Sequence, residues 1–272
     1  ALTAAFALVF LIIGRAIRKL YQFVAYQFSK YVPRRISIVF GVLVVGLLIN
    51  FIYTGVLAKT FFAVANQLFS TMDVKIKPKF TQPTTELRSG SKDSAVTWES
   101  LGVQGRKFVA TGPTSAEITT FSGTPAQEPI RVFAGIASAD SIDERADLVL
   151  KELIRTKAFE RKAILITTST GTGWIDPKSV EPFEYINNGD SAVAGMQYSY
   201  LPSWISLLAD QDTVKNSSST LFNKIYGYWS QLPADDRPQI YLYGLSLGSF
   251  GVENVLNSVE LVNEPINGAL LA

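Results

Sequence analysis

The amino-acid sequence predicts an α/β fold: a mostly parallel sheet with helices on both faces, preceded by transmembrane α-helices. After about residue 98, short apolar strand-like runs alternate with stretches of helical spacing, as in buried parallel strands joined by helices. Before residue 73, long uncharged apolar runs are typical of membrane spans. We therefore divide the chain into a transmembrane region (1–72), a linker or entry segment (73–97) and an α/β domain (98–272).

Two apolar runs define the expected membrane region. Residues 36–58 carry no charge and are long enough to cross a bilayer as a helix, whereas a secretory signal peptide would have a shorter apolar core. Residues 1–13 resemble the end of a second, truncated span. Short loops rich in Lys and Arg stay in the cytoplasm, and the loop between the two runs is of this kind. Its basic residues are Arg15, Arg18, Lys19, Lys30, Arg34 and Arg35. We thus expect residues 15–35 to be cytoplasmic, the C-terminal domain to lie outside the cytoplasm, and the lipid bilayer to be a partner.

The composition excludes several kinds of site. The chain has no cysteine and no histidine, which excludes disulfides, thiolate and imidazole metal ligands and a cysteine nucleophile. We expect neither a metal nor a cofactor. The net charge of +2 combines seven basic and no acidic residues in 1–72 with a net −5 in 73–272. Because the basic excess lies among apolar runs, it indicates a membrane surface rather than nucleic acid.

The α/β region contains nine expected elements. We expect strands at 130–133, 163–167, 192–197, 239–243 and 268–272, and helices at 143–159, 177–186, 216–229 and 247–256. Asn216-Ser217-Ser218 matches a glycosylation sequon, but we interpret it as the start of a helix.

The motif Gly244-Leu245-Ser246-Leu247-Gly248 matches G-x-S-x-G between an expected strand and an expected helix. This is the context of a nucleophile elbow, in which a sharp turn lifts the serine hydroxyl above the sheet. Ser246 is the candidate nucleophile, and the amide of Leu247 is one candidate oxyanion donor. The alternative is a glycine-rich turn of a nucleotide-binding fold, but neither a P-loop lysine nor G-x-G-x-x-G accompanies it.

A second candidate segment is TSTGTGWIDP, residues 168–177, directly after an expected strand. The loop two strands before an elbow supplies the other oxyanion amide, and Thr170, Gly171 or Thr172 would donate here. A plain turn is the alternative for the glycines, and we interpret Asp176 and Pro177 as a helix N-cap and first helical residue.

Aromatic residues follow the 192–197 strand. Tyr198, Tyr200 and Trp204 are candidates to line an acyl or sugar pocket at the carboxyl ends of the strands, and ordinary packing of a loop over the sheet is the alternative.

These segments in this order, namely RVFAGIASA, the helix from Arg145 to Phe159, GTGWIDP, QYSYLPSW and GLSLGSFG, resemble a bacterial α/β-hydrolase family. Its members join an N-terminal multi-span membrane domain to a C-terminal hydrolase-like catalytic domain. The resemblance covers about residues 95–272. It implies serine esterase activity with Ser246 as nucleophile, and it implies no defined substrate.

The sequence departs from that family in one respect. The fold needs an acid and a histidine after strands later than the elbow, and neither is present. We expect the C-terminal part of the hydrolase domain to be missing. The leading hypothesis is a membrane-anchored serine hydrolase or acyltransferase acting on an acyl ester or lipid-like substrate outside the cytoplasm. The alternative is a non-catalytic accessory subunit that uses the domain for docking in a larger membrane complex.

Overall fold

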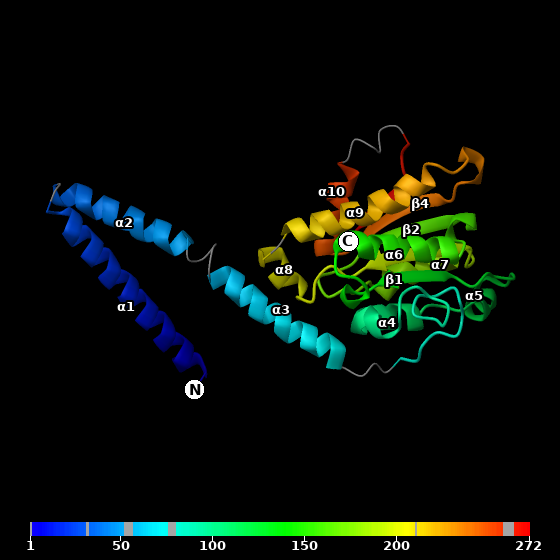
Figure 1. Cartoon of the computed structure of the whole chain (residues 1–272), viewed down its shortest axis with the longest axis horizontal. Helices are drawn as coiled ribbons and strands as arrows, with labels where there is room; N and C mark the ends of the chain where they lie inside the picture. Colours follow the sequence, from blue (N-terminus) through cyan, green and yellow to red (C-terminus); the bar gives the residue numbers. More distant parts are fainter. Residues whose placement is uncertain (1, 31–32, 52–56, 76–79, 210, 258–263) are drawn as a thin grey trace. The chain divides into compact units, whose positions relative to one another are not determined.

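The computed structural model describes the chain except residues 1, 31–32, 52–56, 76–79, 210 and 258–263. The chain divides into two compact units, residues 1–64 and 65–272. Figure 1 shows the elements of both units. The second unit contains every candidate catalytic residue.

The first unit is built on two helices, α1 (Leu2–Phe28) and α2 (Arg34–Phe51), which pack against each other. A Cβ added at Gly41 of α2 would lie 3.1 Å from the Cβ of Ala25 in α1, so the glycine allows close approach. The rings of Phe28 and Phe40 lie 4.6 Å apart. A third helix, α3 (Leu57–Lys75), begins in this unit and ends in the next.

The described helices do not support the two expected transmembrane spans. Within the described residues, we find no helix whose length and apolar character suffice for crossing a bilayer. The helix that contains residues 2–13, α1, continues through Arg15, Arg18 and Lys19. Helix α2 has 18 residues and begins with two arginines just before the 36–58 run, and residues 52–56 of that run lie outside the described part.

The second unit contains a five-stranded parallel sheet in the order β1-β3-β2-β4-β5. The strands are β1 (Ile130–Ala134), β2 (Ala163–Thr168), β3 (Ser191–Met196), β4 (Gln239–Gly244) and β5 (Gly268–Leu271). Residues of β1, β2 and β3 are buried throughout, as expected for strands covered on both faces. The prediction of a mostly parallel sheet is confirmed.

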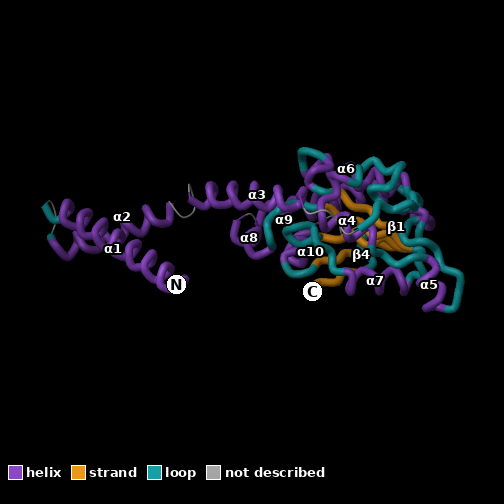
Figure 2. The backbone as a smooth tube through the Cα atoms, turned by 90° about the horizontal axis from the view of Figure 1, so that it is seen from below, coloured by secondary structure: helices purple, strands orange, loops and turns teal. Residues whose placement is uncertain are grey.

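Helices cover both faces of this sheet (Figure 2). One layer contains α6 (Ile142–Arg155), α9 (Gln211–Trp229) and α10 (Leu247–Leu256), which contact one another in that order. The other face carries α4 (Gly102–Ala110) and α7 (Pro177–Ile186). Arg131 of β1 joins these last two, since it donates to the Phe108 carbonyl of α4 and pairs with Glu184 of α7. The second unit also contains two short helices, α5 (Ser115–Ser122) and α8 (Ser203–Ala209).

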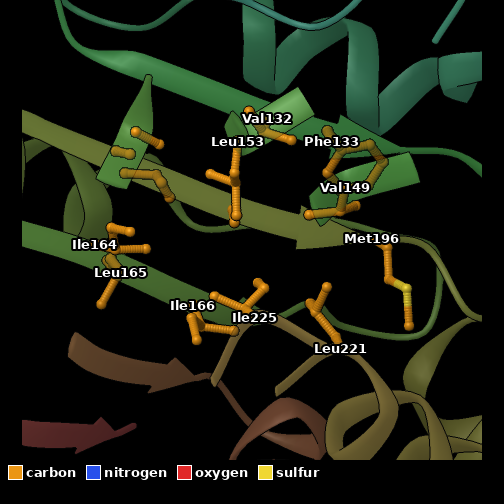
Figure 3. Packing of buried hydrophobic residues seen from close by; sticks show 14 of the residues in the cluster. Val132, Phe133, Val149, Leu153, Ile164, Leu165, Ile166, Met196, Leu221 and Ile225 are labelled. Atoms are coloured by element: carbon orange, nitrogen blue, oxygen red, sulfur yellow. The ribbon is translucent and has the colours of Figure 1, made fainter. Parts of the chain in front are cut away.

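The core of the second unit lies between the sheet and its helices. Figure 3 shows side chains of α6 and α9 packed with side chains of the strands. Val149 and Leu153 of α6 and Ile225 of α9 are fully buried, and Leu221 of α9 nearly so. Their spacing of four residues places each pair on one helix face, which explains why these helices pack as they do.

Local signals account for several helix starts. Ser141 and Glu144 form a capping box at the start of α6, and the Asp176 side chain caps α7 with Pro177 as its first residue, as we predicted. The expectation of a helix start at Asn216 is wrong. Helix α9 begins at Gln211, so the sequon lies inside it, with Ser217 and Ser218 buried.

The segment that we interpreted as a linker contributes to the domain. Within 73–97, Arg88, Ser89 and Val96 are buried, and Arg88 bridges to Arg131 of β1 through an isolated parallel pairing. The buried carboxylate of Glu152 in α6 anchors the segment, because it accepts hydrogen bonds from Ser94 and from the Ala95 amide (both 2.8 Å).

Candidate functional site

The strand order makes the connections diverge at the carboxyl ends of β2 and β4. These strands are neighbours, with Thr168 opposite Gly244. The chain leaves β2 towards β3 on one side, and it leaves β4 towards β5 on the other. In open α/β sheets, ligands bind at such a point, where connections diverge. The loops that follow β2 and β4 are the two segments that the sequence analysis selected for nucleophile and oxyanion donors.

Ser246 occupies the turn between β4 and α10 with φ 54° and ψ −116°. For a residue with a Cβ this is an unfavourable conformation, which persists only where the surrounding structure imposes it. The side chain is exposed, although Gly244 before it and Leu247 and Gly248 after it are buried. A strained, exposed serine between a buried strand and a helix has the geometry expected of a nucleophile elbow.

The glycines of the motif are required by close backbone contacts. A Cβ at Gly244 would lie 2.4 Å from the carbonyl oxygen of Gly248, and a Cβ at Gly248 would lie 2.3 Å from the carbonyl oxygen of Thr168. Both distances are shorter than Cβ atoms tolerate, and the obstructing atoms belong to backbone. The second contact holds the start of α10 against the end of β2, so it brings the two candidate loops together.

Hydrogen bonds to the carbonyl oxygens of Gly244 and Ala272 also hold the turn that contains Ser246. The Ser249 hydroxyl lies 2.7 Å from the Gly244 carbonyl oxygen and 2.9 Å from that of Ala272. The Ser246 amide donates to the Ala272 carbonyl at 2.7 Å. The sequence analysis did not assign Ser249 a role. Its position three residues after Ser246, on the first turn of α10, explains how the turn is held.

Two of the four candidate oxyanion amides are already engaged. The Thr170 amide donates to the Trp174 carbonyl (3.0 Å), and the Gly171 amide donates to the Ser203 hydroxyl (3.2 Å). The amides of Thr172 and Leu247 donate to no other group in the part of the chain that the structure describes. The Leu247 amide is at the first position of α10, where backbone N–H groups lack helical partners and the helix dipole favours an anion.

The three candidate pocket aromatics differ in exposure. Tyr198 is buried and packs with Val214, Phe250 and Leu247, the last of which directly follows Ser246 in the chain. Its hydroxyl has no hydrogen-bond partner among the described residues, and burial raises the pKa of Tyr198 above its ordinary value. Tyr200 is half-buried, and Trp204 is 65% exposed. The assignment of a shared pocket to these residues remains a prediction.

Further polar groups lie near the carboxyl ends of β1 and β3, and the sequence analysis missed them. Gln197 directly follows β3, and its side-chain oxygen accepts from the Ile136 amide at 3.3 Å. Asp73 accepts from the Val103 amide at 3.0 Å. Arg145 lies in the first turn of α6 and is buried. Only the position of Gln197, at the end of a strand, could have indicated the site. Within the described residues, we find no cluster of three or more acidic side chains suited to a metal ion.

Among the comparisons with known proteins, the family profiles agree with an α/β-hydrolase fold. A sequence profile described as alpha/beta-hydrolase family matches residues 130–272, and one described as alpha/beta-hydrolase family N-terminus matches residues 1–113. These descriptions name neither a bacterial source nor a membrane anchor. No curated protein and no solved structure matches the chain.

Proposed function

Because this chain belongs to the α/β-hydrolase family, we propose that it acts as a serine hydrolase or acyltransferase on an acyl ester, through an acyl-enzyme on Ser246. One observation carries the proposal. Ser246 is exposed and holds a strained backbone conformation between β4 and α10, at the carboxyl ends of the neighbouring strands β2 and β4. Strain of this kind clusters at functional sites, because folding alone would favour a relaxed residue.

The proposed reaction uses groups on both loops. The Ser246 Oγ attacks the ester carbonyl, its proton passes to a general base, and the carbonyl oxygen becomes an oxyanion. The amides of Leu247 and Thr172 stabilise the oxyanion by hydrogen bonds. The C–O bond to the alcohol then breaks, the alcohol leaves with a proton, and an acyl-serine remains. Attack by water completes hydrolysis, and attack by another hydroxyl completes acyl transfer.

A fluorophosphonate probe tests the nucleophile on the full-length protein. We expect the wild type to be labelled and Ser246→Ala to be unlabelled. Ser122→Ala is the matched control, because Ser122 is an exposed serine at the end of α5, away from the elbow. Labelling that persists in Ser246→Ala, or no labelling of the wild type, would contradict the proposed function.

One observation favours a second candidate. The 272 residues contain no histidine, which is the usual base of a serine in this fold. A serine hydroxyl without a base is a weak nucleophile. In the second candidate, the domain is a non-catalytic docking body in a larger membrane complex. It predicts an unlabelled wild type that co-purifies with partner subunits, so the same experiment separates the two.

Surface chemistry of the first unit supports association with a lipid bilayer. Large apolar side chains on α1 and α2 are exposed, among them Leu11, Phe23, Val39 and Leu47. All seven charges in residues 1–72 are positive, which favours anionic lipid. That residues 15–35 are cytoplasmic and the C-terminal domain lies outside the cytoplasm remains a prediction. A reporter fused after residue 75 should be active outside the cytoplasm, and activity inside would refute it.

A further inference from the structure

Arg145 is a buried cation at the same edge of the sheet as the elbow. It lies in the first turn of α6, which follows the carboxyl end of β1, and it is 5% exposed. Its Nη1 donates to the Ala139 carbonyl oxygen at 3.0 Å, whereas its Nε is buried without a partner in the described structure. The Nε donor of this guanidinium therefore has no partner inside the protein, where unsatisfied polar groups are costly.

Other buried arginines of the domain have a charged or aromatic partner, although the Nε atoms of Arg88 and Arg106 are also without a hydrogen-bond partner in the described structure. Arg88 pairs with Glu128 at 3.0 Å, Arg131 pairs with Glu184 at 2.6 Å, and Arg106 lies over the Trp98 ring. Within the described residues, Arg145 forms no ion pair with any carboxylate and lies over no aromatic ring.

The carboxylates nearest to Arg145 along the chain or near Tyr200 accept hydrogen bonds from other groups. The Glu144 carboxylate accepts from the amide and the hydroxyl of Ser141 (both 3.0 Å) in the α6 capping box. Asp73, which lies near Tyr200, accepts from the Val103 amide. Burial lowers the pKa of Arg145, and an arginine nevertheless stays charged at neutral pH. The Glu144 charge acts on the Arg145 guanidinium, but within the described residues no carboxylate forms an ion pair with it, as buried charges usually do.

One loop connects this cation to the nucleophile. Tyr200 interacts electrostatically with Arg145, and Tyr198, two residues earlier, packs against Leu247 beside Ser246. The loop follows β3, which is separated from β4 by β2 alone. Neighbouring strands lie ~4.8 Å apart, so the ends of β3 and β4 are on the order of 10 Å apart.

We propose that Arg145 binds a carboxylate or phosphate group of the substrate, so that the ester cleaved at Ser246 carries an anion on the order of 10 Å from its scissile carbonyl. This inference rests on the proposed function. The planar guanidinium offers a fork of donors that matches either anion, and burial strengthens the interaction. Arg145 is a specificity-determining residue in this proposal, because it does not touch the reacting atoms.

Binding of suberate, a dianion of eight carbons, tests the site without catalysis. Isothermal titration calorimetry of the full-length protein compares suberate with the neutral 1,8-octanediol. We expect wild type and Ser246→Ala to prefer suberate, and Arg145→Gln to lose about 10- to 100-fold in suberate affinity. Lys157→Gln, which removes an exposed cation just after α6, should bind as the wild type does. Equal suberate binding by Arg145→Gln and wild type, or no preference in the wild type, overturns the proposal.

A matched pair of esters tests specificity. The proposal requires kcat/KM for 4-nitrophenyl hemisuberate to fall about 10- to 100-fold in Arg145→Gln, with little change for 4-nitrophenyl octanoate. An equal loss of kcat/KM for both esters in Arg145→Gln indicates that Arg145 has a structural role, and it overturns the proposal. If neither ester is hydrolysed by the wild type, the proposed function fails, and suberate binding still decides the role of Arg145. If Arg145→Gln does not fold, Arg145→Lys replaces it and must bind suberate more weakly than wild type. Wild-type affinity in that variant overturns the proposal.

Discussion

Replacing Ser246 by glycine should stabilise the protein while it removes the nucleophile. The reason is the backbone of Ser246, whose φ of 54° and ψ of −116° suit glycine and penalise any residue with a Cβ. A residue held in such a region costs ~1–3 kcal/mol. Glycine also increases the conformational entropy of the unfolded chain, which offsets ~0.4–1 kcal/mol of the gain. Relative to Ser246→Ala, which retains the strain, Ser246→Gly should therefore gain about 0.5–2 kcal/mol.

Thermal unfolding followed by circular dichroism measures this difference. In a domain of this size, 1 kcal/mol shifts Tm by roughly 2–4 °C, so we expect Tm of Ser246→Gly to exceed that of Ser246→Ala by about 1–8 °C. Glu253 provides the matched control, because it is an exposed position inside the same helix, α10. There the order should reverse, with Glu253→Gly about 1 kcal/mol less stable than Glu253→Ala. If glycine is no better than alanine at position 246, the backbone there is not strained and the elbow argument fails.

Two further predictions concern the supports of the site. Gly248→Ala should destabilise the protein by about 1–3 kcal/mol and abolish probe labelling of Ser246, because the added Cβ would lie 2.3 Å from the Thr168 carbonyl oxygen; unchanged Tm and labelling would refute this. For Glu152, burial raises the pKa, but hydrogen bonds from Arg155, the Ala95 amide and Ser94 outweigh burial and lower it. Since the folded-state pKa lies below that of an unfolded glutamate, the carboxylate stabilises the fold above about pH 4.3, and this contribution is lost as the pH falls through the folded-state pKa. Urea unfolding across that range should show a weaker pH dependence in Glu152→Gln, and an unchanged dependence would count against the assignment.

Local patterns determined much of the α/β domain. The strands at β2 and β4 and the helices α7 and α10 follow the expected ranges closely, because apolar periodicity, Asp176-Pro177 and the G-x-S-x-G turn are short-range signals. Helices α4 and α5 were not anticipated, since their sequences are short and weakly patterned. The packing of residues 80–98 was missed for a related reason. A segment without regular structure is ordered here by distant partners such as Glu152.

The apolar composition of the long runs in the first unit was not sufficient to predict its helices. The absence of charge in 36–58 predicted a span, whereas the described helices of this run are α2, which ends at Phe51, and α3, which begins at Leu57. Among the described helices, none meets the requirement for crossing a bilayer. Hydropathy reports the average preference of a segment and does not give the bounds of its helices.

By itself, the sequence determined that Ser246 stands between a strand and a helix with small residues on either side, because that motif is local. Only the tertiary structure decided that β2 and β4 are neighbours. As a result, the Thr168 carbonyl oxygen lies so close to Gly248 that a Cβ would not fit there, and the two candidate loops meet. It also decided which amides remain free, since the partners of Thr170 and Gly171 come from the fold of their own loop and from Ser203. Arg145 illustrates the same division. Its position on a helix can be read from spacing, but its lack of an ion-pair partner among the described residues depends on every group that packs around it.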